Sequence, residues 1–518
     1  MTSGLHNGYH LFRLIMLAKV YSCALIGLEG AIVEVEADIS PGLPSFTVVG
    51  LPDAAVQEAR ERVRAAIRNS GYSFPPRRIT VNLAPADLKK AGPAYDLPIA
   101  VAILVGSGQC RGDLSNTLLL GELSLDGSLR HTNGILPMVA LARDKNMSSV
   151  IVSENDAAEA ALVEGIDIAC FKNLRQLSEA ISSPDPLAYY HPEDAGYNAS
   201  KPAVRFDMSH IKGQEHVKRA LEVAAAGAHN IIITGPPGSG KTMLARALAS
   251  ILPPMTRNEA LEVTKIYSVS GLLPANTPLI INRPFRAPHY TISSAGMVGG
   301  GSWPKPGEIS LSHRGVLFLD ELPEFGASKL EMLRQPLEDR LVTISRVKGS
   351  ISFPANFMLV GAMNPCPCGY YNDPVKTCSC SPSAIARYQQ RLSGPFTDRI
   401  DIFINAPLVD YEKLTSDRHG EKSEGIAKRV AAAKNRQLDR FQGNSASSNS
   451  DIRAEDIPNF CATDDTARSL LREGMRQLQL SARGYHRILK LARTIADLDD
   501  SLIIKAHHVA EAIQYRPR

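Results

Sequence analysis

The chain has 518 residues, of which 44% are hydrophobic and 21% are charged, as expected for a folded protein of about two to four domains. Its formal charge of +4 is only mildly basic, so the overall charge neither requires nor excludes a polyanionic partner. The composition excludes a disordered chain, and no run approaches the roughly 20 apolar residues that a membrane-spanning helix needs.

The first 16 residues are a candidate N-terminal extension, because Met16 is an alternative start to Met1. The apolar stretch at 11–28 is interrupted by Arg13 and Lys19, and a secretory signal would lack a clear cleavage site. Four of the eight cysteines stand alone and four cluster, which favours metal ligands over a disulfide framework. A cytoplasmic protein without a membrane partner is expected.

Residues 17–182 predict an α/β domain. Strand-like runs at 32–36, 46–49 and 79–83 alternate with helical stretches, of which residues 53–70 are the clearest. Residues 183–203 contain prolines and little periodicity, so they predict a linker.

The next region, residues 204–407, contains a complete phosphate-binding loop. The loop follows an apolar run and precedes an alanine-rich helical stretch, so it has the expected strand–loop–helix setting. Glycines let successive backbone N–H groups wrap phosphates, and the helix points its positive end at them. We expect Lys241 to reach the β- and γ-phosphates of ATP and Thr242 to bind Mg²⁺. The loop consists of Gly235, Pro236, Pro237, Gly238, Ser239, Gly240, Lys241 and Thr242.

Two further strands are expected to bring polar side chains to this loop. A buried apolar run directly precedes Asp320 and Glu321, and a second run precedes Asn364. Asp320 can hold Mg²⁺ together with Thr242, while Glu321 can polarise the attacking water. Asn364 can orient that water; the alternative for Asn364 is a turn residue at the end of a strand.

Two segments that follow the phosphate-binding loop in the chain are candidates for contact with DNA. The residues at 341–353 alternate around a basic tip with Arg346 and Lys348, which predicts a β-hairpin. A glycine-rich stretch that ends near Trp303 and Lys305 is the second candidate. Cationic tips can meet phosphates, and an aromatic ring can stack on a base. A solvated hairpin tip and a flexible loop are the alternatives.

Four cysteines form two C-x-C pairs, separated by nine residues, within an insertion at 364–382. This number of thiolates can build a closed tetrahedral Zn²⁺ site, which folds a loop too small to have its own core. Because C-x-C is tighter than the usual C-x₂-C, another metal, a disulfide or free thiols remain alternatives. The cysteines are Cys366, Cys368, Cys378 and Cys380.

The last region, residues 408–518, predicts a helical domain.

Two arginines are candidates for contact with a γ-phosphate: Arg399, just before a short strand, and Arg483, at the start of a helix. An arginine held there accelerates phosphoryl transfer by roughly 10³–10⁵, although a surface salt bridge is the alternative for each. One helical face is predicted to carry four arginines: Arg472, Arg476, Arg483 and Arg487.

Together these motifs resemble an AAA+ ATPase of the clade that contains magnesium chelatase subunits and minichromosome-maintenance helicases. The segments Arg-Pro-Phe-Arg-Ala-Pro-His at 283–289 and Pro-Gly-Glu-Ile-Ser-Leu-Ser-His at 306–313 closely resemble the YifB/ComM family. The resemblance covers nearly the whole chain and implies a parallel sheet with helices on both faces, followed by a helical lid. It implies that Asn364 is sensor 1, Arg483 is sensor 2, and Arg399 is an arginine finger offered to a neighbouring subunit. A finger that acts in trans implies a homo-hexameric ring.

The first domain resembles the Lon protease fold without its chemistry. Residues 90–96 are similar to the Lon nucleophile segment, but Ala94 stands where Lon has serine, and Leu136 replaces the lysine. A Ser–Lys dyad needs both its nucleophile and its base. The resemblance therefore implies a non-proteolytic domain that serves as an assembly or DNA-contacting collar.

The family resemblance implies an ATP-driven motor on single-stranded, forked or branched DNA, which promotes branch migration in homologous recombination and natural transformation. ATP, Mg²⁺ and a structural Zn²⁺ are the expected cofactors, and a recombinase is a candidate partner. The alternative is a magnesium-chelatase-type ATPase that remodels a protein partner, although such a subunit normally lacks both the collar and the four-cysteine insertion. A Lon-type protease would need the missing dyad.

Overall fold

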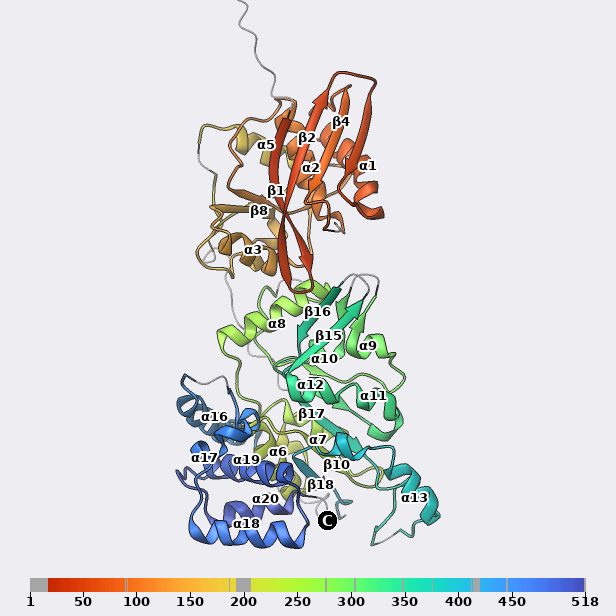
Figure 1. Cartoon of the computed structure of the whole chain (residues 1–518), viewed down its shortest axis with the longest axis vertical. Coiled ribbons are helices and arrows are strands. Elements are labelled where there is room, and N and C mark those ends of the chain that lie inside the picture. The colour runs from red at the N-terminus through yellow and green to blue at the C-terminus, as the bar shows by residue number, and fades with distance from the viewer. Residues whose placement is uncertain are drawn as a thin grey trace, which may run out of the picture. The chain divides into compact units, whose positions relative to one another are not determined.

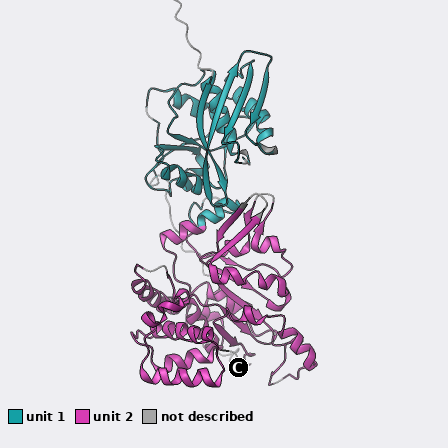
Figure 2. Ribbon diagram, in the orientation of Figure 1, with its two compact units in different colours: residues 1–199, 264–279 teal, residues 200–263, 280–518 magenta. Residues whose placement is uncertain are grey.

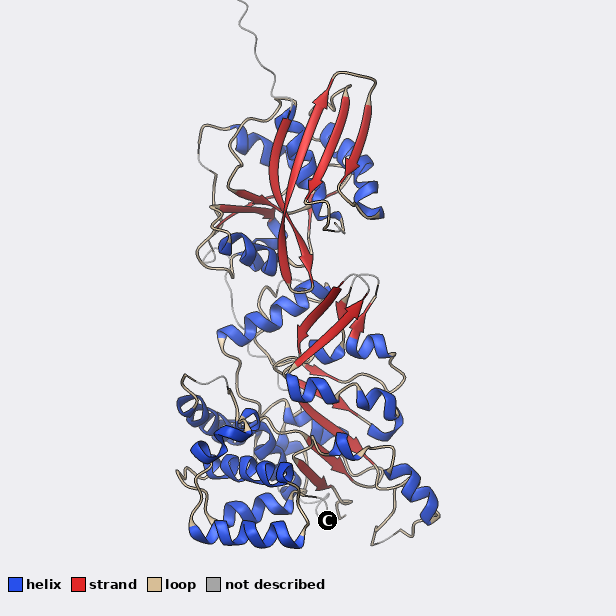
Figure 3. Cartoon of the chain, viewed as in Figure 1, coloured by secondary structure: helices blue, strands red, loops and turns tan. Residues whose placement is uncertain are grey.

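The computed structural model describes residues 17–88, 90, 92–185, 187–191, 206–274, 277–301, 304–346, 349–374, 376–410, 412, 420–443 and 446–516. The chain forms two compact units (Figure 2). The first contains Met1–Ala199 and Thr264–Leu279, and the second contains Ser200–Val263 and Ile280–Arg518. Both units combine helices and strands, so both are α/β (Figure 3).

A seven-stranded sheet of order β3-β4-β2-β1-β5-β8-β9 forms the first unit (Figure 1). β2 pairs antiparallel with both β1 and β4, whereas the other neighbouring strands run parallel. Three of the strands lie where the sequence predicts them, in β2, β3 and β4. The strands are β1 (Leu17–Ile26), β2 (Glu29–Ser40), β3 (Ser45–Val49), β4 (Arg78–Ala84), β5 (Thr117–Leu119), β8 (Ser149–Ser153) and β9 (Asp167–Phe171), with the separate pair β6 (Glu122–Leu123) and β7 (Leu129–Arg130).

The helices of the first unit begin with the one that the sequence predicts most clearly. Asp53 is the N-cap of α1, and its carboxylate accepts the Val56 N–H at 2.9 Å. α2 is apolar on all sides and almost entirely buried. Ala94 lies in a short 3₁₀ turn before α2, and Leu136 is buried in α3. The helices are α1 (Ala54–Asn69), α2 (Asp96–Gly106), α3 (Ile135–Asp144), α4 (Ala157–Ala160) and α5 (Leu174–Ser182).

A five-stranded sheet of order β11-β14-β17-β10-β18 forms the centre of the second unit. All of its neighbouring strands are parallel, and β14 and β17 are buried along their whole length. Because the strands share one direction, the loops that follow β10, β14 and β17 meet at one edge of the sheet. The strands are β10 (Ile231–Thr234), β11 (Phe285–Arg286), β14 (Val316–Leu319), β17 (Met358–Met363) and β18 (Ile402–Asn405).

Two antiparallel pairs lie outside this sheet. β15 (Leu341–Arg346) and β16 (Gly349–Pro354) form the hairpin that the alternating sequence predicts. Val342 and Phe353 face each other across this pair and are buried, so the hairpin has an apolar inner face. β12 (Gly299–Gly300) and β13 (Lys305–Pro306) form the second pair, inside the glycine-rich stretch.

Helices surround the parallel sheet. Buried side chains of α6 and α7 belong to the same apolar core as β10 and β17. Among the residues that the model describes, no helix combines the length and the apolar character needed to cross a membrane. The helices of this part are α6 (Glu215–Gly227), α7 (Lys241–Leu248), α8 (Arg257–Ser270, of which the residues from Thr264 on belong to the first unit), α9 (Ser294–Val298), α10 (Glu308–Leu311), α11 (Ala327–Glu331), α12 (Arg334–Asp339), α13 (Pro382–Gln389) and α14 (Gly394–Thr397).

The end of the chain is helical, as predicted, but one detail of the prediction is wrong. Arg472 and Arg476 lie on α18, whereas Arg483 and Arg487 lie on α19, so the four arginines do not share one helical face. Helix α18 ends at Gln477, and Gln479 has a φ of 47°, which an α-helix cannot include. The helices are α16 (Ser423–Arg440), α17 (Ile457–Phe460), α18 (Asp465–Gln477), α19 (Ala482–Leu498) and α20 (Ala506–Gln514).

Candidate functional site

The phosphate-binding loop joins β10 to α7, and its glycines are needed for two different reasons. Gly238 and Gly240 have φ values of 81° and 80°, in the left-handed region that favours glycine. Gly235 instead lacks room, because a Cβ atom there would lie 2.2 Å from the carbonyl oxygen of Ala406. The loop therefore has the open backbone that a phosphate needs, and it leads into the N-terminus of a helix.

Lys241 lies inside the loop and contacts the residue expected to be sensor 1. Its Nζ donates to the carbonyl oxygens of Gly235 and Pro236, both at 2.8 Å, and to Asn364 Oδ1 at 3.1 Å. Burial lowers the pKa of the ammonium, and the charge of Asp320 opposes this shift. The fold thus brings Lys241 and Asn364 together, although 123 positions separate them.

Thr242 and Asp320 are also in direct contact. Thr242 Oγ1 donates to Asp320 Oδ2 at 2.7 Å, and the backbone N–H of Glu321 donates to Asp320 Oδ1 at 3.0 Å. A hydroxyl and a carboxylate at this distance from each other are oxygen ligands that suit Mg²⁺ beside bound phosphates.

Glu321 follows Asp320 at the end of β14, in an unusual backbone conformation. Its φ of 50° turns the chain sharply, and its side chain is exposed. Glu321 and Asn364 line a pocket of about 410 Å³, together with Glu324 and Arg391. Glu324 pairs with Arg391 at 2.7 Å, whereas the Glu321 carboxylate has no such partner within the described residues.

The two candidate arginines converge on a residue that the sequence analysis missed, Glu338 of α12. Arg399 Nη2 is 2.6 Å from Glu338 Oε2, and Arg483 Nη2 is 3.8 Å from Glu338 Oε1. Arg399 is nearly buried and also donates to the carbonyl oxygen of Arg334 at 3.2 Å. Across the described residues, the hydrogen bonds and ion pairs of these two side chains do not reach the phosphate loop. No local motif marks Glu338.

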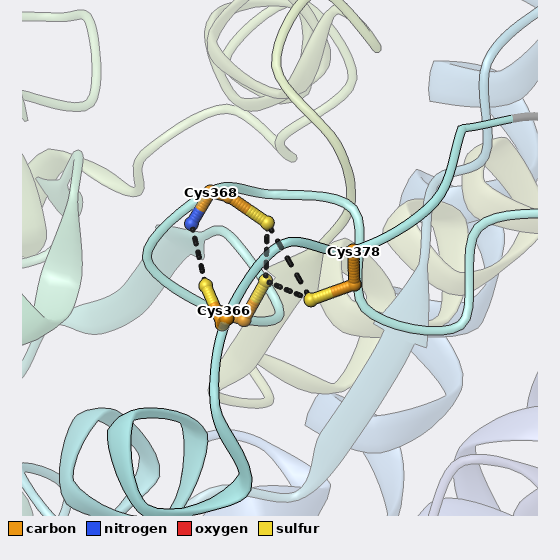
Figure 4. A group of neighbouring side chains, drawn as sticks. Cys366, Cys368 and Cys378 are labelled. Carbon is orange, nitrogen blue, oxygen red and sulfur yellow. Dashed lines mark hydrogen bonds between the residues drawn. The ribbon is translucent and has the colours of Figure 1, made fainter.

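The four clustered cysteines come together as a compact group (Figure 4). The Sγ atoms of Cys366, Cys368 and Cys378 lie 3.4 to 3.7 Å from one another, and all four sulfurs lie within 4.8 Å. Zinc–sulfur bonds of about 2.3 Å in a tetrahedron place sulfurs about 3.8 Å apart, so the group fits Zn²⁺. The backbone N–H of Cys368 also points at Cys380 Sγ, at 3.4 Å.

Two thiols of this group have pKa values that are shifted in opposite directions. A backbone N–H bond from Tyr370 lowers the pKa of the Cys368 thiol to about 5. Although the backbone N–H of Cys380 favours the Cys378 thiolate, burial and the neighbouring sulfurs raise the pKa of that thiol to about 12. Adjacent thiolates repel one another, so a positive charge among the four sulfurs would stabilise their deprotonated forms.

The cysteine insertion packs against the phosphate loop. Gly369 has a φ of 86°, and a Cβ atom there would lie 2.4 Å from Pro237 Cδ. Cys366 also follows Asn364 by only two positions. The cysteine insertion is therefore tied both to the loop expected to hold the phosphates and to the sensor residue.

The residues proposed for contact with DNA are described only in part. Trp303 and Lys348 lie outside the described residues, and so does the side chain of Arg346. Lys305 is exposed at the start of β13. Each segment contains an antiparallel pair of strands.

Comparison with known proteins supports one family for the whole chain. Three family models match: magnesium chelatase subunit ChlI at residues 207–414, subunit ChlI of Mg-chelatase at 35–156, and the C-terminal part of the same subunit at 420–516. The competence protein ComM of Haemophilus influenzae is 44% identical over 96% of this chain and 97% of its own length. The protein YifB of Escherichia coli is 42% identical over 96% of this chain and 97% of its own. The magnesium-chelatase 67 kDa subunit of Heliobacterium mobile is 28% identical over 30% of this chain and 28% of its own.

Proposed function

Because this chain belongs to the YifB/ComM family of magnesium-chelatase-related AAA+ ATPases, we propose that it is an ATP-hydrolysing ring motor that acts on DNA. The contact set of Lys241, Thr242, Asp320 and Asn364 at one edge of the parallel sheet carries the ATPase part of this proposal. Such a set can bind the phosphates and Mg²⁺ of ATP at one point, with Glu321 beside them.

Each residue of the set has a separate role in the proposed hydrolysis. Lys241 balances the charge of the β- and γ-phosphates, while Thr242 and Asp320 hold Mg²⁺. When bound, Mg²⁺ supplies positive charge to the same phosphate oxygens. Glu321 accepts the proton of the attacking water, Asn364 orients that water, and the products are ADP and phosphate.

Arg399 and Arg483 act on the ATP of a neighbouring subunit in this proposal. Their shared partner, Glu338, supports it, because both guanidinium groups pair there instead of at their own phosphate loop. Exchange of the Glu338 carboxylate for a γ-phosphate keeps each arginine paired, so the nearly buried charge of Arg399 is not left alone. A contact offered by each subunit to the next is head-to-tail and closes into a ring, for which a hexamer is the proposed size.

The DNA part of the proposal is supported by two observations. The hairpin β15–β16 and the pair β12–β13 are antiparallel pairs in the two segments with basic residues, and the exposed Lys305 begins one strand of the second. The relative named competence protein ComM matches nearly the full length of this chain. We therefore assign the motor to branch migration of recombination intermediates, including those formed in natural transformation.

Forked DNA is expected to stimulate ATP hydrolysis several-fold, and Lys241→Ala is expected to abolish both the basal and the stimulated rate. The physical reason is that Lys241 supplies the charge nearest to the phosphates, while DNA acts only on a subunit that can bind ATP. The measurement is the steady-state rate of phosphate release with no DNA, duplex, fork and four-way junction. Robust hydrolysis that no DNA changes would favour the protein-remodelling alternative.

Zn²⁺ is proposed to fill the four-cysteine group and to stabilise the phosphate loop through Gly369 and Pro237. Cys366→Ser combined with Cys378→Ser is expected to remove about one zinc ion per chain. Elemental analysis measures the zinc, and binding of a fluorescent ATP analogue is expected to weaken because Pro237 loses its neighbour. Cys170→Ser, a lone cysteine of the first unit, is the matched control. Unchanged zinc content in the double variant would contradict the assignment.

A magnesium-chelatase-type motor that remodels a protein partner is the second candidate. The three matching family models favour it, since each is named after a chelatase subunit. The coverage argues the other way, because the Heliobacterium mobile chelatase subunit aligns with only 30% of this chain. We therefore rank it below the DNA motor.

A further inference from the structure

One amide side chain, that of Asn230, joins three parts of the ATPase core. Asn230 is buried and lies directly before β10, the strand that leads to the phosphate loop. Its Oδ1 accepts the Leu359 N–H of β17 at 2.9 Å, and its Nδ2 donates to the carbonyl oxygen of Arg399 at 3.0 Å. A single side chain therefore connects the phosphate-loop strand, the strand that ends at Asn364, and the turn that carries Arg399.

The backbone of Asn230 holds the same turn. Its carbonyl oxygen accepts the N–H groups of Asp401 and Ile402, both at 3.0 Å, and its N–H donates to Asp401 Oδ2 at 3.2 Å. That carboxylate is also 3.3 Å from the buried His229 ring. Burial raises the pKa of Asp401, but the His229 hydrogen bond and the charge of Arg487 outweigh it and hold the pKa at about 2.

The helical C-terminal region, residues 408–518, fixes the other side of the turn at 399–401. Arg487 of α19 and Arg516 donate to the carbonyl oxygen of Ile400 at 3.2 and 3.0 Å. The backbone at 399–401 is thus hydrogen-bonded both to the residue before β10 and to the C-terminal region. The side chain of Arg399 extends from this backbone. Among the described residues, only Asn230 donates a hydrogen bond to the carbonyl group of Arg399 itself.

We propose that Asn230 is a positioning residue, which sets where the Arg399 guanidinium meets the γ-phosphate bound by the next subunit. The inference rests on the proposed function, because it takes Arg399 as the arginine that acts across subunits. The rate of phosphoryl transfer depends steeply on the place of such a group, so a shift of about 1 Å can cost 10²-fold in rate. The amide is therefore expected to affect the reaction through geometry without touching ATP.

Asn230→Ala is expected to lower the kcat of ATP hydrolysis by about 100-fold. The Kd for a fluorescent ATP analogue is expected to change by less than about threefold, because the phosphate loop itself is untouched. A merely structural role would weaken ATP binding as well, since Asn230 directly precedes the strand of that loop. If the alanine variant does not fold, Asn230→Asp replaces it: the carboxylate still accepts from Leu359 but cannot donate to Arg399.

Rings that mix two variants test whether the loss of kcat in Asn230→Ala arises from Arg399. Asn230→Ala subunits keep an intact phosphate loop, and Lys241→Ala subunits keep an intact finger. In a random equimolar ring, roughly a quarter of the ATP sites combine an intact phosphate loop with an intact Arg399 from the neighbouring subunit. ATP hydrolysis is therefore expected to rise above that of either variant alone. A mixture of Arg399→Ala with Lys241→Ala is expected to recover in the same way.

The mixed rings can overturn the inference in two ways. Recovery of the Arg399 mixture without recovery of the Asn230 mixture refutes the role of Asn230 and leaves the proposed function intact. No recovery in either mixture refutes the action of Arg399 across subunits, and both proposals then fail. Asn82→Ala is the control, because this amide lies on β4 of the first unit and donates to Glu36 Oε2 at 2.9 Å. An equal loss of kcat in that control would also refute the specific role of Asn230.

Discussion

Replacement of Arg399 by alanine is expected to lower the rate of ATP hydrolysis by about 10³-fold or more and to leave ATP affinity nearly unchanged. The guanidinium is placed against the charge that develops on the γ-phosphate only during the reaction, so its loss affects kcat more than binding. Its present contacts fit this role, since Glu338 and the Arg334 carbonyl oxygen bind the guanidinium through polar contacts that a phosphate can replace. Phosphate release and equilibrium binding of a fluorescent ATP analogue separate the two quantities.

Two variants show whether the effect depends on the planar guanidinium. Arg399→Lys keeps the charge but not the two-pronged geometry, and it is expected to recover only part of the rate. Arg399 and Arg453 both line a cavity of about 1040 Å³. Arg453→Ala is the control, because the Arg453 side chain is 65% exposed and lies 3.7 Å from Glu455. This control is expected to behave as the wild type. A rate within about threefold of wild type in Arg399→Ala would show that phosphoryl transfer here does not use this finger.

The sequence predicts the parallel sheet and the ATP-site residues because their signals are local. The phosphate loop is one continuous motif, and Asp320, Glu321 and Asn364 each directly follow an apolar run. Parallel strands bring such positions to one edge, so the order of the motifs already implies their proximity. The side-chain contacts between Lys241, Thr242, Asp320 and Asn364 agree with that argument.

The partners of these residues could not be predicted, because nothing local identifies them. Glu338 lies in a short helix and becomes notable only when Arg399 and Arg483 reach it from two other segments. Asn230 and Arg399 are 169 positions apart, and their hydrogen bond depends on how the turn packs beside β10. The prediction that four arginines share one helical face is wrong for a similar reason. The chain leaves the helical conformation at Gln479, a residue type that gives no strong helix-ending signal in the sequence.

Glu321→Gln is expected to lower the rate of hydrolysis by about 10²- to 10⁴-fold while ATP still binds. An amide keeps the size of the side chain but cannot accept the proton of the attacking water. The position favours this role, because Glu321 is exposed at the end of β14 and, within the described residues, its carboxylate is not held by another group. A free carboxylate can take up a water molecule, whereas a paired one must first break an ion pair.

Glu324→Gln is the matched control, because Glu324 lines the same pocket but pairs with Arg391 at 2.7 Å. This variant is expected to hydrolyse ATP at nearly the wild-type rate. Single-turnover measurements with excess enzyme isolate the chemical step from product release. If Glu324→Gln stops hydrolysis and Glu321→Gln does not, the base is the second carboxylate, and the strained backbone at Glu321 serves another purpose. If both remain active, the water is activated by the phosphate itself, and the pocket only positions it.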